Sequence, residues 1–178
     1  MIVAKGQDRI AIVGESVTVK LPRSNPVQFG NHVRKIVRKK GPAAVIDSWT
    51  RYDTDQYGSL KRALLRGVVA NQRETRLARN FGQVVIPTVS ILGGMANLQP
   101  TSQPLELPHR EIHGCFVEYL GPLVTRLGHM LEDPSNLGIY DGMVRFVDGG
   151  SRGLGELMKI KGDEIGAVLE TLTLKVNG

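Results

Sequence analysis

The apolar residues of this chain follow two different spacings, and this change limits the possible folds more than any other feature. Between residues 10 and 21 they fall close to alternate positions, which predicts a strand, or a hairpin broken near Gly14. From Phe29 to Val37 they recur every three or four positions, as on one face of a helix. The 21 glycines and 9 prolines are also more than an all-helical bundle favours. We therefore expect an α+β fold.

Length and hydropathy indicate one domain. A chain of 178 residues is long enough for one ordinary domain and short for two. Its 41% content of hydrophobic residues can fill a core. We expect a single compact domain over residues 1–178, with a mostly antiparallel sheet packed against helices. No stretch approaches 18 uninterrupted apolar residues, so any membrane contact is expected to be peripheral.

The remaining elements are predicted from local patterns. After the helix over residues 29–40, helices are expected at residues 55–71, extending to residue 80, and at residues 123–131. Strands are expected at residues 84–92, 112–120 and 137–147. Residues 93–108 hold three prolines and two adjacent glycines, and predict a long exposed loop. The sequence does not decide whether residues 43–53 and residues 154–176 form helices or strands.

Positive charge is concentrated in one part of the chain. Residues 20–80 contain 14 Lys and Arg against 4 Asp and Glu, whereas residues 81–178 contain 7 against 11. Such a distribution predicts a cationic end for anionic partners and an acidic end that other copies of the chain contact. The competing interpretation is that these charges are merely solvated.

Two basic clusters are the candidate binding residues. The first lies on the predicted helix at residues 29–40 and comprises Arg34, Lys35, Arg38, Lys39 and Lys40. The second follows at a three-residue spacing and comprises Arg73, Arg76 and Arg79. Basic amphipathic helices bind phosphate backbones and anionic lipid headgroups. Aromatic residues make up only 5% of the chain, so base stacking is not expected to carry the contact.

No pattern in the sequence predicts catalysis, a metal site or a cofactor. His109, His113 and Cys115 lie close together, but no further pair of ligands completes a tetrahedral zinc site. Cys115 is the only cysteine and is expected to be a buried strand residue. The glycine-rich residues 149–155 lack the spacing of a phosphate-binding loop and are interpreted as a flexible turn. The carboxylates of Glu106, Glu111 and Glu118 have no predicted nucleophile or second acid beside them.

Several short segments, in order along the chain, resemble the matrix proteins of rhabdoviruses. Residues 17–25 are similar to the family's first strand and Arg-Ser-Asn turn. Trp49 and Tyr52, followed by Tyr57, Leu60-Lys61 and Leu64-Leu65, resemble its Trp/Tyr segment and leucine-rich run. His113-Gly114-Cys115 and, above all, residues 136–142 resemble two further stretches, the latter being close to Asn-Ile-Gly-Leu-Tyr-x-Gly. The resemblance covers about residues 15–145, and the short length resembles the cytorhabdoviruses of plants.

The resemblance implies a viral matrix protein in the virion, between nucleocapsid and envelope, and peripherally on host membranes. Its implied partners are the nucleoprotein–RNA complex, the inner surface of an anionic membrane, the cytoplasmic tail of a viral glycoprotein, and other copies of itself, joined head to tail. The implied self-association loop matches residues 93–108, with contacts at Met95, Leu98, Leu105 and Leu107. The family's Pro-Pro-x-Tyr motif is absent here, so recruitment of budding machinery through it is not implied.

Two other classes remain open on the sequence alone. One is a free-standing RNA-binding protein, such as a suppressor of RNA silencing, which binds bare RNA without assembly. The other is a structural component of a virion that has no lipid role. The sequence does not decide whether RNA, nucleoprotein or lipid contacts the basic residues.

Overall fold

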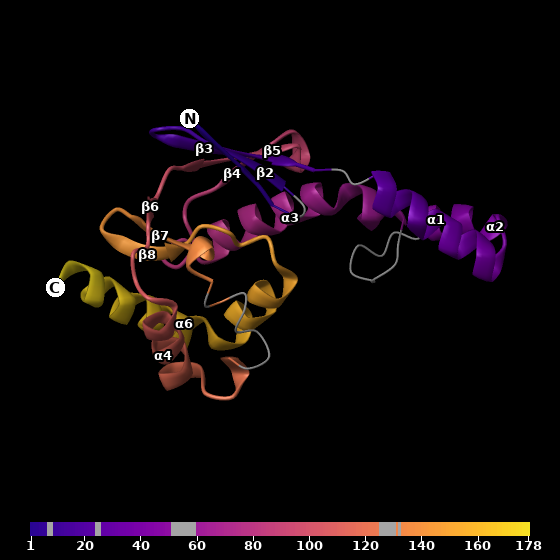
Figure 1. The fold of residues 1–178 in the computed structure, drawn as a ribbon. Coiled ribbons are helices and arrows are strands. Elements are labelled where there is room, and N and C mark those ends of the chain that lie inside the picture. The colour runs from indigo at the N-terminus through magenta and orange to yellow at the C-terminus, as the bar shows by residue number, and fades with distance from the viewer. Residues whose placement is uncertain (7–8, 24–25, 51–59, 125–130, 132) are drawn as a thin grey trace.

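The chain folds into a single compact α+β arrangement, as the sequence predicts (Figure 1). The structure is a computed structural model and describes residues 1–6, 9–23, 26–50, 60–124, 131 and 133–178. A five-stranded antiparallel sheet lies on one side of a long helix. A smaller three-stranded sheet and two further helices lie beyond the end of that helix and hold most of the apolar core.

The five-stranded sheet has the order β1-β2-β3-β5-β4, with every neighbouring pair antiparallel. Its strands are β1 (Ile2–Lys5), β2 (Arg9–Val13), β3 (Val17–Pro22), β4 (Val89–Ile91) and β5 (Ala96–Pro100). The predicted hairpin at residues 10–21 is confirmed as β2 and β3. The N–H of Gly14 closes its turn by donating to the carbonyl of Val17 at 3.0 Å.

Helix α3 (Leu60–Asn80) packs against β3, β4 and β5. It is one helix with a kink at Leu65, so the predicted extension to residue 80 is confirmed. Helices α1 (Pro26–Lys40) and α2 (Ala43–Thr50) pack on each other and on α3, and project away from the rest of the molecule (Figure 1). The helix predicted from Phe29 to Lys40 is thus confirmed, and it ends where Gly41 adopts a φ of 84°.

The smaller sheet has the order β6-β7-β8 and comprises β6 (Gln103–Pro104), β7 (Leu137–Tyr140) and β8 (Met143–Phe146). The predicted interruption at Asp141 and Gly142 is confirmed as the turn between β7 and β8, where both residues have positive φ. Helices α4 (His109–Leu120) and α6 (Arg152–Asn177) pack on each other, and α6 also packs on β8. Residues 154–176, whose type the sequence does not decide, belong to helix α6, which has a kink at Lys161.

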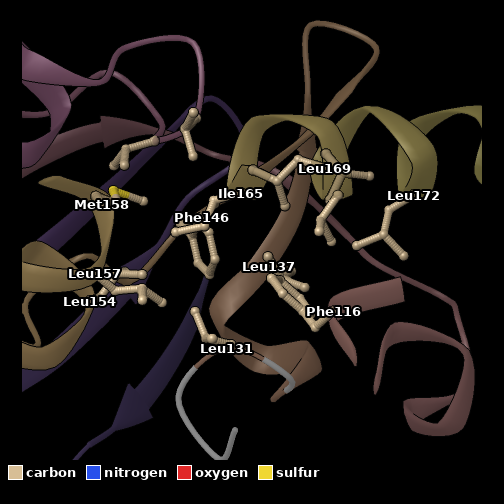
Figure 2. Close-up of a cluster of buried hydrophobic side chains, with 14 of the residues drawn as sticks. Phe116, Leu131, Leu137, Phe146, Leu154, Leu157, Met158, Ile165, Leu169 and Leu172 are labelled. Carbon is tan, nitrogen blue, oxygen red and sulfur yellow. The ribbon is translucent and has the colours of Figure 1, made fainter. Parts of the chain in front are cut away.

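The main core forms where α4, α6 and the β7–β8 hairpin meet (Figure 2). Phe116 of α4 and Phe146 of β8 are fully buried, with ring centroids 6.4 Å apart. Ile165 and Leu172 of α6 are also fully buried. Since each fully buried side chain of this size contributes about 1.5–3 kcal/mol, this region carries much of the fold's stability.

Two predictions about secondary structure are wrong in whole or part, and a third cannot be compared along most of its length. Residues 112–120 form a helix and not a strand, because Ile112, Phe116 and Leu120 recur every four residues and are all buried. The strand predicted at residues 84–92 is reduced to β4, which follows Pro87 and precedes the short 3₁₀ helix η1 (Leu92–Gly94). Most of the helix predicted at residues 123–131 lies outside the described residues.

The long exposed loop predicted at residues 93–108 is also wrong. The segment contains β5, which has neighbours on both sides in the large sheet, and β6 in the small sheet. Pro100 and Pro104 are the last residues of β5 and β6, where the missing N–H costs no interior sheet bond, and Pro108 precedes α4. Leu105 follows at 6% exposure within the core.

Candidate interaction surfaces

Helices α1 and α2 form a basic arm, which here means residues 26–50. On α1 the apolar side chains of Phe29, Val33 and Ile36 are partly buried. The predicted cationic residues Arg34, Lys35, Arg38, Lys39 and Lys40 are all exposed. Helix α1 contains no Asp or Glu, and its last turn carries three of the cations, where the helix dipole favours positive charge.

The cations of α1 are available to an external partner. In the part of the chain that the structure describes, no ion pair joins any of the five to a carboxylate. All five cations lie within residues 34–40, which is about 10 Å of the helix at about 1.5 Å per residue. Spacing of this kind suits a surface with many phosphates better than a single small anion.

The second predicted basic cluster lies elsewhere on the molecule. Arg76 and Arg79 are exposed, and Arg73 is partly buried, in the last turns of α3. That end of α3 approaches the smaller sheet, whereas the arm projects from its other end (Figure 1). The structure therefore does not combine the two clusters into one surface.

The residues predicted for self-association also separate into two groups. Met95 is 54% exposed and caps η1, and Leu98 of β5 is partly buried. Leu105, in contrast, is 6% exposed in the core, and Leu107 packs against that core. A contact with a neighbouring copy is open to Met95 and Leu98, whereas Leu105 and Leu107 already have partners within their own chain.

A buried cluster of ionised groups joins the sheet, α3 and the β8–α6 connection, and none of the expectations above includes it. Glu74 of α3 is almost completely buried. One of its oxygens, Oε2, accepts from Arg9 at 2.8 Å and from Asn97 at 3.1 Å. The other, Oε1, accepts from Lys20 at 2.6 Å and from the backbone N–H of Gly149 at 3.1 Å. The carboxylate thus has two charged and two neutral donors.

Asp148 completes this ion cluster. Its carboxylate pairs with the guanidinium of Arg9 and accepts from the N–H of Gly150 at 3.1 Å. Burial raises the pKa of the Asp148 carboxyl, but Arg9 and Lys20 outweigh that effect, so the pKa lies below its ordinary value. Lys20 also donates to the carbonyl of Val147. Two cations and two carboxylates therefore balance one another inside the protein.

One sequence signal points to this cluster. Glu74 is the only acidic residue between residues 60 and 105, and it lies on a helix with six Lys and Arg. A lone carboxylate in the middle of a basic helix is a candidate partner for cations elsewhere. Alternating polar and apolar residues predict the strand β3. They do not show that its polar face, with Thr18 and Lys20, is the face that packs against α3.

A cleft of about 810 Å³ opens beside the ion cluster, between β1 and β2 on one side and residues 134–137 on the other. Its lining includes Arg9, Lys20 and Asp148. Arg9 and Lys20 each contact a carboxylate already, so their charges are balanced; Lys5 also lines the cleft.

The glycine-rich residues 149–155 do not form the flexible turn predicted for them. Gly149 and Gly150 are buried beside the ion cluster, and Ser151 caps α6 by accepting from the N–H of Leu154 at 3.1 Å. Gly153 and Gly155 belong to the first turns of α6. A side chain on Gly150 would lie 2.8 Å from Arg9, so this position requires glycine for close packing.

The predicted ligand and acid–base candidates are placed on or near α4. His109 and His113 stack with ring centroids 6.4 Å apart, one turn from each other on α4. Cys115 is buried as predicted, on a helix and not on a strand. Glu106, Glu111 and Glu118 are exposed. A search of the described residues for three or more side chains able to hold a metal ion found none.

None of the described helices combines the length and the apolar character needed to cross a bilayer.

Comparison of the chain with protein-family models, with curated proteins and with solved structures gave no match.

Proposed function

We propose that this chain is a structural protein of the viral matrix type. It self-associates into a layer, condenses a helical nucleocapsid and links it to the inner surface of an anionic envelope membrane, without catalysing a reaction. The proposal is supported by the ordered sequence resemblance described above and by the position of the basic arm.

The observation that carries the proposal is the exposure of the five cations on α1. They lie on an arm that stands apart from the core, on a helix without a single carboxylate. An arm in this position reaches a large, flat or helical polyanion without steric conflict from the rest of the chain. An enclosed site, in contrast, suits a small ligand.

Assembly strengthens such contacts. A single arm that meets phosphates in water gives a modest, salt-sensitive affinity, because each exposed charge contributes little. Many arms on one layer act together, and the combined binding exceeds that of any one of them by orders of magnitude. The arm is therefore suited to a protein that works as a polymer and not as a monomer.

The test compares binding of the full chain with that of two charge-reversal variants. Lys39→Glu with Lys40→Glu removes two cations from the arm. Lys159→Glu with Lys175→Glu makes the same charge change at exposed positions on α6 and is the matched control. Binding is measured by flotation with phosphatidylserine vesicles and by co-sedimentation with nucleoprotein–RNA, over a series of salt concentrations.

The arm variant should lose at least about tenfold in affinity, while the control stays close to the unaltered protein. Electron microscopy of the unaltered protein on vesicles should show an ordered layer. Equal losses in both variants would mean that only net charge matters, and the arm proposal would then be abandoned. Preference for bare RNA over nucleoprotein–RNA would favour a free-standing RNA-binding protein, and failure to float would favour a lipid-independent virion component.

A further inference from the structure

The outer face of the five-stranded sheet, opposite α3, is composed almost wholly of aliphatic side chains. Alternate residues of a strand point to the same face. On β3 the outer residues are Val17, Val19 and Leu21, and the strand register places Ile12 of β2 and Leu98 of β5 beside Val19. The other outer positions of the five strands are apolar as well, with the exception of Lys5 on β1.

None of the elements that the structure describes covers this face. Helix α3 packs on the opposite, inner face, where Lys20 and Asn97 contact Glu74. Figure 1 shows no other described element over the outer face. At its margins Val3 is 52% exposed, Val17 47% and Val89 64%.

On β3 and β5 the usual distribution of polar and apolar side chains between the two faces is thus reversed. An antiparallel sheet with one solvated face ordinarily turns its apolar residues inward and its polar residues to water. Here the inner face buries Lys20, Asn97 and Gln99 on β3 and β5. On β1 and β2 the inner side is also partly aliphatic, with Ile2 and Val13 lining the cleft. The outer face, in contrast, is aliphatic except for Lys5. Contiguous apolar patches of this kind mark surfaces that meet another molecule.

We propose that the outer face of the five-stranded sheet is the interface between two copies of this chain, packed sheet on sheet. Identical aliphatic faces related by a two-fold axis are complementary without any further change. Side chains of two such faces interdigitate with the sheets about 10 Å apart. The one charged residue, Lys5, lies on the outermost strand, so it remains at the solvated rim.

The size of the face fits a reversible dimer. Strands about 4.8 Å apart, with about 3.3 Å per residue, give five strands a face of roughly 20 Å by 20 Å. Each copy then contributes on the order of 400 Å², or roughly 800 Å² for the pair, which is below the about 1,200 Å² of stable interfaces and in the range of weak, transient contacts. We therefore expect association that depends on protein concentration.

A lipid surface fits this face less well. Peripheral membrane surfaces combine apolar residues with aromatic and cationic ones. The outer face has no aromatic residue, and its one cation, Lys5, lies on the outermost strand. The other strand cations, Arg9 and Lys20, point to the inner face, where carboxylates bind them.

This inference rests on the self-association included in the proposed function and assigns one of its contacts to a surface. It replaces contacts through Leu105 and Leu107 with contacts through Leu98 and its neighbours. A two-fold contact closes on itself, so a layer also needs a second contact between dimers. A single arm contacts polyanions without dimerisation, although more weakly than arms joined by assembly, so the two proposals can fail separately.

The experiment measures sedimentation velocity of the full chain from about 1 to about 100 µM, a range that brackets weak to moderate affinities. Val19→Lys with Leu98→Lys places two charges in the centre of the face. Ile160→Lys with Leu174→Lys introduces the same charges at exposed aliphatic positions of α6 and is the matched control. A milder pair, Val19→Thr with Leu98→Thr, keeps strand propensity and serves if the lysine pair does not fold.

The unaltered protein and the α6 control should dimerise with the same constant. The face variants should dimerise at least about tenfold more weakly while keeping their circular dichroism and a salt-sensitive binding to anionic vesicles that is weaker than that of the α6 control. The proposal would be overturned if the unaltered protein stayed monomeric over the whole concentration range. It would also be overturned if both pairs of face substitutions left the dimerisation constant unchanged. Loss of flotation on neutral vesicles in the face variants, without a change in oligomeric state, would assign the face to lipid instead.

Discussion

The ammonium group of Lys20 lies 2.6 Å from Oε1 of Glu74, although the two residues are 54 positions apart in the chain. Both side chains are buried, at 8% and 1% exposure. This pair and Arg9 attach the N-terminal strands to α3 through charge and not through apolar packing. A buried pair of this kind contributes little by itself, but it becomes costly when one partner is removed.

Replacement of Glu74 by alanine should therefore strongly destabilise the protein. It leaves Arg9 and Lys20 buried without their shared carboxylate, which costs about 3–5 kcal/mol of unfolding free energy. Urea denaturation measures the loss. Glu170→Ala, at an exposed position of α6, is the control and should change stability by no more than about 0.5 kcal/mol. Similar values for the two variants would mean that the ion cluster is unimportant for stability.

Alanine should be tolerated much better at Gly149 than at Gly150. A β-carbon on Gly150 meets the guanidinium of Arg9 at 2.8 Å, and that group is held by Glu74 and Asp148. The first atoms near Gly149 lie at 3.5 Å, which is ordinary contact. We expect Gly150→Ala to lower the unfolding free energy by about 1–3 kcal/mol. Thermal unfolding of both variants checks this, and equal melting temperatures would contradict it.

The Asp148 carboxylate should make part of the protein's stability depend on pH. Its pKa is lower in the folded state than in the unfolded chain, so the folded state favours the ionised form. This contribution is complete above the ordinary Asp pKa of about 3.9 and is lost as pH falls through the lower folded value. Since the side chain is 44% exposed, solvent screening reduces the effect.

The measurement is urea denaturation of the unaltered protein and of Asp148→Asn at several pH values. The stability difference between them should be constant near neutral pH and should shrink below about pH 4. A difference that grows toward acid would show that the pKa of Asp148 is raised and not lowered.

Leu105 should behave as a core residue and not as a contact between copies. Leu105→Ala removes a side chain that is 6% exposed, and should cost about 2–5 kcal/mol of stability. Met95→Ala, at 54% exposure, should cost little. Chemical denaturation and sedimentation together separate loss of folding from loss of association. If the Leu105 variant were folded with unchanged stability, Leu105 would again be a candidate for contact between copies of the chain.

The sequence predicts elements well where one periodicity dominates. The β2–β3 hairpin, α1 and the β7–β8 hairpin were all found where alternation or helical spacing is clear. Helix α4 was missed because His113-Gly114-Cys115 interrupts the apolar pattern, although Ile112, Phe116 and Leu120 keep a four-residue spacing. Local propensity also misjudged residues 93–108, where pairing with distant strands overrides proline and glycine.

The ion cluster could not be predicted, because its members come from four distant segments. Arg9 and Asp148 are 139 residues apart, and nothing local indicates that they pair. Alternation on β3 does not show which of its two faces is buried. The usual assumption, with Val19 in the core and Lys20 in solvent, gives the wrong orientation of the sheet. The exposure of the α1 cations, in contrast, follows from composition alone, since strongly charged helix faces are rarely buried.

The separation of Arg9 from Asp148 also has a consequence for biosynthesis. At about 5–20 residues per second, the ribosome needs roughly 7–28 s to add the intervening chain. During that interval the first three strands can emerge and pair, but one side of them carries unneutralised charge and the other bare aliphatic side chains. The first 22 residues of this protein, which hold these three strands, are therefore a segment in which a nascent-chain chaperone would find an exposed target.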